Sequence, residues 1–191
     1  MLPAVPRPIT LIYAHPYPDR SRACRALLTA VHDLPSVQVR SLYALYPDFS
    51  IDVDQERQAL LRSEVIVWQC PFYWYGLPSL LHLWIEKVLG HGWAYGAGGT
   101  AVRDKTVLWV TTTGAPPEAY APGQMHGHSF DTFVPAVLQT ARFCGMRWSG
   151  PPVVVHGAHR ISDGELQLAA TAYRRRLEAL ALATPEGPPD A

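Results

Sequence analysis

Residues 14–24, AHPYPDRSRAC, combine an imidazole and a hydroxyl at the point where an apolar run gives way to a helical pattern. The segment has neither a GxGxxG fingerprint nor a P-loop lysine, so the common dinucleotide and nucleoside triphosphate signatures are absent. It offers His15 beside a helix that begins at Ser21, and the free amides and dipole of a helix N-terminus can hold one phosphate. In the alternative interpretation, Ser21 only caps its helix and His15 only fills a turn.

Four consecutive aromatic residues follow the apolar run at residues 64–70. A half-buried strand would alternate and a helix would space its rings, whereas this run ends in Gly76 and Pro78. Some of the rings must therefore face outward. Aromatic side chains that line a cleft beside a phosphate site suit a planar heteroaromatic ring. The four residues are Phe72, Tyr73, Trp74 and Tyr75.

A third segment, residues 111–128, is long for a connection within a compact domain. Long ordered loops tend to be functional, and the alternative is a flexible surface segment. The loop carries Tyr120 and His126, which can donate hydrogen bonds or protons. Its first backbone amides belong to Thr112, Thr113 and Gly114.

Alternating strand and helix patterns must bring these loops together. Strands are expected at residues 9–14, 37–42, 64–70, 105–114 and 152–156. Helices are expected at residues 21–34, 54–63, 78–89, 131–144 and 163–183. Five strands interleaved with five helices predict an α/β fold, a flavodoxin-like doubly wound five-stranded parallel sheet of order 2-1-3-4-5.

In such sheets, ligands bind beyond the carboxyl ends of the strands, near the point where the strand order reverses. The loops that follow Ala14, Cys70 and Thr113 leave this same edge, so we expect them to form one site. A monophosphate site, a cleft for a flat ring and polar backbone contacts together describe flavin mononucleotide (FMN).

The composition indicates a single globular domain spanning residues 1–191, with loosely ordered proline-rich tails at 1–8 and 184–191. Apolar residues make up 48% of the chain, and 16 basic residues balance 16 acidic ones. This balance argues against a nucleic-acid-binding protein, which usually has a basic excess.

The three cysteines are widely spaced, which argues against a disulfide framework and favours a reducing compartment. The sequence shows neither a signal peptide nor an apolar run long enough to cross a bilayer, so we expect a cytoplasmic protein. The histidine pairs HGH and HGAH lack a carboxylate or thiol set, and no metal site is expected.

Several long motifs resemble the flavodoxin-fold NAD(P)H quinone reductase family. They are YAHPYPDRSRA, LYPDF, PFYWYGLPSLLHLWIEKVL, HGWAYGAGGTA and TTTG. The resemblance is greatest to bacterial members that are ancillary proteins of glutathione-regulated potassium-efflux systems, and it covers residues 9–182. It implies a homodimer with FMN at the interface, two-electron reduction of quinones by NADPH or NADH, and activation of the efflux transporter.

The same resemblance assigns the site residues by position. The phosphate contacts match His15, Ser21, Arg22, Ala23 and Cys24. The segments along the two edges of the flavin ring match Phe72, Tyr73, Trp74 and Tyr75, and Thr112, Thr113, Gly114 and Ala115. Tyr120 and His126 match residues that assist quinone reduction. Cys24 replaces a common Asn and Ala115 replaces a common Gly, so FMN affinity is expected to be lower.

Two further expectations concern partners. Apolar residues wrap more than half of the helix expected at 78–89, which favours burial against a second subunit; the alternative is a deeply covered helix of a monomer. A cytoplasmic domain of a potassium-efflux antiporter is the other expected partner, and it would place the protein at the inner face of the membrane. The alternative functions are a non-catalytic regulatory flavoprotein and an azo or nitro reductase.

Overall fold

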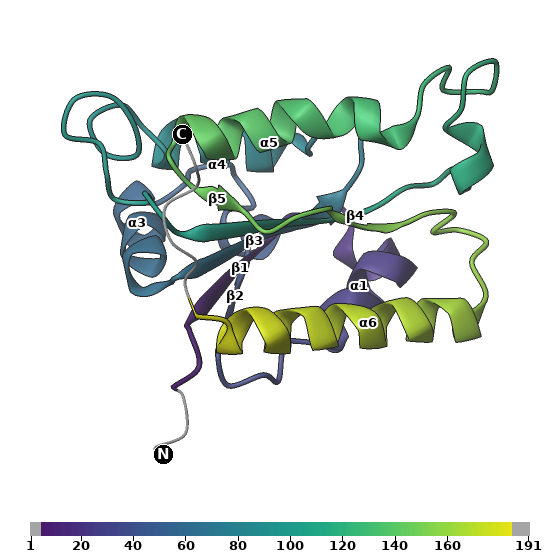
Figure 1. Cartoon of the computed structure of the whole chain (residues 1–191), viewed down its shortest axis with the longest axis horizontal. Helices are drawn as coiled ribbons and strands as arrows, with labels where there is room; N and C mark the ends of the chain where they lie inside the picture. The colour runs from purple at the N-terminus through teal and green to yellow at the C-terminus, as the bar shows by residue number, and fades with distance from the viewer. Residues whose placement is uncertain (1–4, 185–191) are drawn as a thin grey trace.

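The middle layer of the computed structural model, which describes residues 5–184, is a parallel β-sheet with helices on both faces (Figure 1). The strands run in the order β2-β1-β3-β4-β5, and β6 also pairs with β4. The predicted flavodoxin-like order is therefore confirmed. The strands are β1 (Ile9–Tyr13), β2 (Val37–Ser41), β3 (Val65–Pro71), β4 (Thr106–Thr112), β5 (Arg147–Trp148) and β6 (Val153–Val155).

The fifth position of the sheet is divided between two short strands, which corrects the single strand predicted at residues 152–156. β5 pairs with the beginning of β4 and β6 with its end. Between them lie Gly150, with a φ of 101°, and then Pro151 and Pro152. Proline has no N–H to donate to a neighbouring strand, so the pairing with β4 is interrupted there.

Two groups of helices cover the sheet. Helices α1 (Arg22–Thr29) and α6 (Asp163–Leu182) pack on one face, and α3 (Val53–Arg62), α4 (Ser79–Val88) and α5 (Val134–Phe143) pack on the other (Figure 1). A short helix, α2 (Leu42–Leu45), and three 3-10 turns complete the elements of the described chain. The turns are Pro18–Arg20, Pro117–Ala119 and Phe130–Phe133.

The helix boundaries correct three sequence predictions. α1 ends at Thr29 rather than at Leu34. A mixture of helical and tighter turn-type hydrogen bonds continues to Leu34, and Pro35 follows, which cannot extend a helix. The strand predicted to reach Leu42 stops one residue earlier, where α2 begins. The helix predicted from residue 131 starts as a 3-10 turn, because Pro135 occupies the first turn of α5.

Arg7 and Pro8, predicted to belong to a loose tail, are held by the domain. The amide of Arg7 donates to the Ala181 carbonyl at 2.8 Å, and its guanidinium donates to the Glu64 carboxylate at 2.9 Å. The carbonyl of Pro8 accepts from the amide of Glu64 at 2.8 Å. For these two residues the tail prediction was wrong, whereas residues 1–4 and 185–191 lie outside the described structure.

A buried carboxylate ties several elements together on the α3 side of the sheet. The Glu56 side chain is fully buried and accepts from the Tyr46 hydroxyl at 2.6 Å and from Trp84 Nε1 at 2.9 Å. Arg40 of β2 donates its Nε to the same carboxylate at 3.0 Å. Trp84 belongs to α4, which follows the aromatic segment directly. The network therefore also fixes the position of the helix to which that segment is connected.

None of the three cysteines should react with a water-soluble thiol reagent while the protein is folded. All are free and buried, and burial raises the pKa of each, to about 11 for Cys24. The thiolate is the reactive form, so both access and ionisation are blocked. Ellman's reagent at pH 7.5 should titrate no thiol in the native protein and three in guanidinium. Rapid native labelling would contradict this burial.

Candidate functional site

The N-terminus of α1 lies at the carboxyl edge of the sheet, directly after β1 and its following loop. Ser21 is the N-cap residue, yet its side chain makes no capping hydrogen bond to the described helix. The interpretation that Ser21 serves only as a cap is therefore wrong. The first amides of an α-helix have no acceptor within the helix, and the first turn of α1 carries no acidic residue. This terminus is free to receive an anion.

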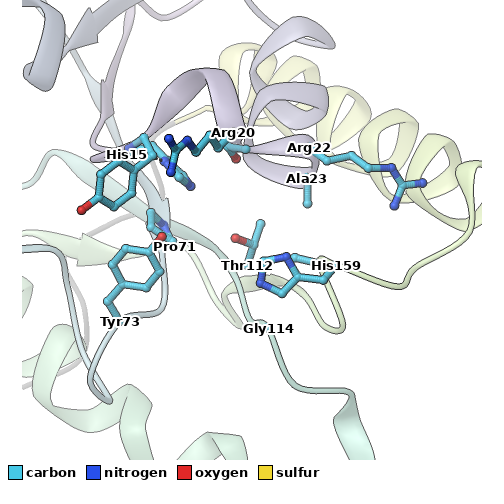
Figure 2. A pocket seen from close by; sticks show the side chains of 12 residues that line it. His15, Arg20, Arg22, Ala23, Pro71, Tyr73, Thr112, Gly114 and His159 are labelled. Carbon is cyan, nitrogen blue, oxygen red and sulfur yellow. Dashed lines mark hydrogen bonds between the residues drawn. The ribbon is translucent and has the colours of Figure 1, made fainter.

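A cavity of about 270 Å³ opens against this terminus (Figure 2). It brings together seven of the predicted site residues, which are His15, Ser21, Arg22, Ala23, Tyr73, Thr112 and Gly114. Five further residues line it, Tyr17, Arg20, Pro71, Ala158 and His159. A Cβ placed on Gly114 would lie 3.4 Å from the His159 ring, at ordinary van der Waals distance, so the loop and this ring are neighbours across the cavity.

The side chain of His15 is arranged to act as a neutral hydrogen-bond donor. Its Nδ1 accepts from the backbone amide of Tyr17 at 3.0 Å. Burial lowers the pKa of His15, which favours the neutral ring. The proton of the neutral ring is therefore on Nε2, and that N–H is left to donate to an anion in the cavity.

The Arg22 guanidinium points away from the cavity (Figure 2). It donates to the Ile161 carbonyl at 2.6 Å and forms an ion pair with Asp163, which joins the start of α1 to the start of α6. Any contact of Arg22 with a phosphate would come from its backbone amide. Arg20 lies at the rim of the cavity on the α1 side, and His159 lies across from it (Figure 2).

Two predicted site residues turn their side chains into the protein. Cys24 is fully buried, and its Sγ lies 3.2 Å from the hydroxyl of Thr112. Thr113 is 1% exposed, and its hydroxyl donates to the Ala115 carbonyl at 2.7 Å. Neither side chain lines the two cavities described here. The predicted contacts of these two residues with a cofactor could therefore come only from their backbone amides, and they remain a prediction.

The aromatic segment forms a tight two-residue hairpin. Tyr73 and Gly76 exchange backbone hydrogen bonds of 3.2 and 3.0 Å, and the residues between them have left-handed φ values of 50° for Trp74 and 62° for Tyr75. This conformation costs large side chains about 1–3 kcal/mol each. Trp74 is 96% exposed, so the prediction that some rings face outward is confirmed, whereas Phe72 belongs to the core.

The hairpin borders a second cavity of about 340 Å³, which shares Gly114 with the first. Its lining residues are Phe72, Trp74, Tyr75, Gly114, Ala115, Tyr120, Met125 and His126. The rings of Tyr120 and His126 stack at 4.2 Å, and both ring nitrogens of His126 are shielded from water without a partner in the described structure.

Comparison with known proteins gives the chain its family. A family model described as flavodoxin-like fold matches residues 7–177. The chain belongs to this flavodoxin-like family. The glutathione-regulated potassium-efflux system ancillary protein KefF of Citrobacter koseri is 48% identical over 169 residues, which cover 88% of this chain and 94% of that protein.

Solved structures agree with the observed fold. General stress protein 14 from Treponema denticola, solved in complex with FMN, is 32% identical with a TM-score of 0.83, covering 91% of this chain and 99% of that one. An NADPH-quinone reductase from P. pentosaceus has a TM-score of 0.80 at 24% identity, over 89% and 97% of the two chains, and shows likeness in fold.

The sequence interpretation missed three polar residues that line the first cavity and a fourth that lies near it. Tyr17 and Arg20 belong to the first loop and His159 follows β6, and all three line the cavity. His156 also follows β6 at the same edge of the sheet, but it lies outside both cavities and contacts Thr113 and Tyr120. The last two were considered only as a metal pair. Within residues 5–184, three or more His, Cys, Asp or Glu side chains nowhere gather into a possible metal site. The HGAH motif directly follows a strand, and this fold binds ligands beyond the carboxyl ends of its strands. That position could have identified the two histidines as candidates for the site.

The stability of the unliganded protein should fall as pH decreases below about 6.5, the usual histidine pKa. Burial lowers the pKa of both His15 and His156 in the folded state. The unfolded chain therefore binds protons first, and stability that is complete above this pH is lost as pH falls. We expect the melting temperature to drop by several degrees between pH 7.5 and 5.5.

The variant His15→Asn with His156→Asn should flatten this pH dependence. The exposed His32 gives the matched control, because His32→Asn should leave the slope unchanged. Differential scanning fluorimetry without FMN makes the comparison. An equally steep loss of stability in the double variant would assign the acid sensitivity to other groups.

Proposed function

We propose that this protein binds FMN and reduces quinones by two electrons at the expense of NADPH or NADH. The observation that carries the proposal is a cavity on the N-terminus of α1 that adjoins an aromatic cavity through Gly114. The fit to FMN rests on the uncapped amides of α1 and the neutral His15. The related Treponema protein, which was solved with FMN, supports the same choice.

The residues of the first cavity would hold the phosphate. FMN supplies the two-electron redox chemistry when it is bound. The first amides of α1 and Nε2 of His15 would donate to the phosphate oxygens, and the helix dipole would favour the negative charge. The backbone around Gly114 and Ala115 lies between the two cavities and is placed to border the ring.

The second cavity would receive the quinone. Tyr120 is buried, and burial raises its pKa. The phenol therefore keeps its proton at neutral pH and can donate to a quinone oxygen. His126 stacks on Tyr120 and offers a second donor or acceptor.

We further propose that the protein works as a homodimer. Trp74 is held in a strained conformation and exposes 96% of its surface, which a second subunit could cover. A largely apolar groove of about 490 Å³ lies between α4 and α5 and includes Ile85 and the exposed Phe143. Light scattering at micromolar concentration should report twice the mass of the chain. A monomer would contradict the dimer.

The likeness to KefF proteins supports a second role for the same protein. We propose that it acts as an ancillary subunit of a glutathione-regulated potassium-efflux transporter and docks on the cytoplasmic part of that transporter. None of the described helices is both long and apolar enough to cross a membrane. Attachment to the inner face of the membrane would therefore depend on the transporter.

Absorbance spectroscopy and transport assays test these roles separately. The FMN-loaded protein should lose its visible flavin absorbance on addition of NADPH or NADH and regain it on addition of a benzoquinone. An azo dye in place of the quinone tests the azoreductase alternative. Potassium efflux from cells that express the transporter with and without this protein tests activation. Bleaching with turnover of neither the quinone nor the azo dye would leave only the regulatory role.

A further inference from the structure

His156 follows β6 and contacts the loop that carries Tyr120. Its Nδ1 lies 2.9 Å from the Thr113 hydroxyl, and that hydroxyl donates its proton to the Ala115 carbonyl. A threonine hydroxyl has one proton, so toward His156 it must act as an acceptor. The contact therefore places the proton of His156 on Nδ1.

The backbone around this contact is held by its own hydrogen bonds. The amide of Thr113 donates to the Val155 carbonyl at 2.9 Å, and the amide of Ala158 donates to the Thr113 carbonyl at 2.8 Å. The amide of Gly157 donates to the Ala115 carbonyl at 2.9 Å. The segment between the two cavities is thus tied along its length to the residues on either side of His156.

The His156 ring also packs against the aromatic wall. It lies 5.3 Å from the ring of Tyr120 and 5.4 Å from that of Phe130, edge-on to the latter. Tyr120 stacks on His126 as well, so one phenol contacts two imidazoles. Of these two, only His156 has a side-chain hydrogen bond to Thr113.

We infer that His156 is a positioning residue, which holds the Thr113 hydroxyl and the Tyr120 ring so that the phenol is aligned to donate to the substrate oxygen. The inference rests on the proposed function, because it names what aligns the donor of that reaction. His156 lies outside both cavities described above, so it acts through its two neighbours rather than on the quinone.

Three substitutions separate the hydrogen bond from the packing of the ring. His156→Phe keeps a ring beside Tyr120 and removes the donor. His156→Asn keeps a donor at the position of Nδ1, and His156→Gln places its amide one bond further out. We expect His156→Phe and His156→Gln to lower kcat for benzoquinone by about tenfold, the equivalent of one hydrogen bond of about 1.4 kcal/mol. We expect the His156→Asn variant to stay within about threefold of wild type.

FMN affinity and the KM for quinone should be the same in all three variants, which a general loss of structure would not allow. In a Tyr120→Phe background, His156→Phe should have almost no further effect, because the two residues act as one unit. The inference is overturned if His156→Phe turns over like wild type, if His156→Asn is as slow as His156→Gln, or if the effects of His156→Phe and Tyr120→Phe simply multiply. Wild-type protein that fails to reduce benzoquinone would instead overturn the proposed function.

Discussion

Replacing Tyr120 with Phe and His126 with Ala in one variant is expected to lower kcat for quinone reduction by about 100-fold. This is the lower end of the rate enhancement that a positioned proton donor gives. The two rings stack at 4.2 Å in the second cavity. Tyr120 is the buried phenol that keeps its proton, and His126 holds two shielded nitrogens without a partner. The variant loses both groups that can donate to the substrate oxygen, whereas the phosphate site is untouched.

Steady-state turnover of a benzoquinone with saturating NADPH measures the effect. The matched control is His128→Ala, because His128 lies two residues along the same loop and is exposed. It should retain wild-type turnover, and FMN binding should be equal in both variants. Unchanged turnover in the Tyr120 and His126 double variant would remove both residues from the reaction.

Replacing Glu56 with Ala is expected to lower the free energy of unfolding by about 3–5 kcal/mol, as for other buried ion pairs that lose one partner. The carboxylate is fully buried and accepts hydrogen bonds from Arg40, Tyr46 and Trp84. Burial and the nearby carboxylate raise the pKa of Tyr46 to about 12, which keeps its hydroxyl a donor. Without Glu56, the Tyr46 hydroxyl and the Trp84 Nε1 lose their acceptor, and the Arg40 charge stays partly buried with only neutral acceptors, at Gln55 and Tyr46, among the described residues.

Urea unfolding of the Glu56→Ala variant measures this loss, with the slope of the transition as a check on two-state behaviour. The matched control is Glu64→Ala. The Glu64 carboxylate also pairs with an arginine, Arg7, but half of its side chain is exposed, so we expect a loss below about 1 kcal/mol. A loss of that size in the Glu56 variant would show that the network adds little to stability.

Periodicity was sufficient to predict the order of the sheet. β3 is buried on both faces as its continuous apolar run predicts, and the register of β1, β3 and β4 brings the loops after Tyr13, Pro71 and Thr112 to one edge. The site predicted at that edge follows from this order alone. Ser21 was ambiguous in the sequence, because a serine at a helix start has the same pattern whether or not its hydroxyl caps the helix.

Features that depend on contacts distant in sequence could not be predicted. Cys24 turns toward Thr112, 88 residues away, and Thr113 turns toward His156. The sequence does not show which of two adjacent threonines points inward at the end of a strand. The hairpin at Trp74 and Tyr75 was also unexpected, since large aromatic residues disfavour the left-handed conformation that both adopt.

The most direct test of the account is a comparison of FMN with riboflavin, which lacks the phosphate. Fluorescence titration of the flavin-free protein measures both affinities under the same conditions. If the phosphate binds at the N-terminus of α1 beside His15, FMN should bind at least about 100-fold more tightly, as two or more charge-assisted hydrogen bonds allow. Equal affinity for the two flavins, or no binding of FMN by the folded protein, would contradict the account.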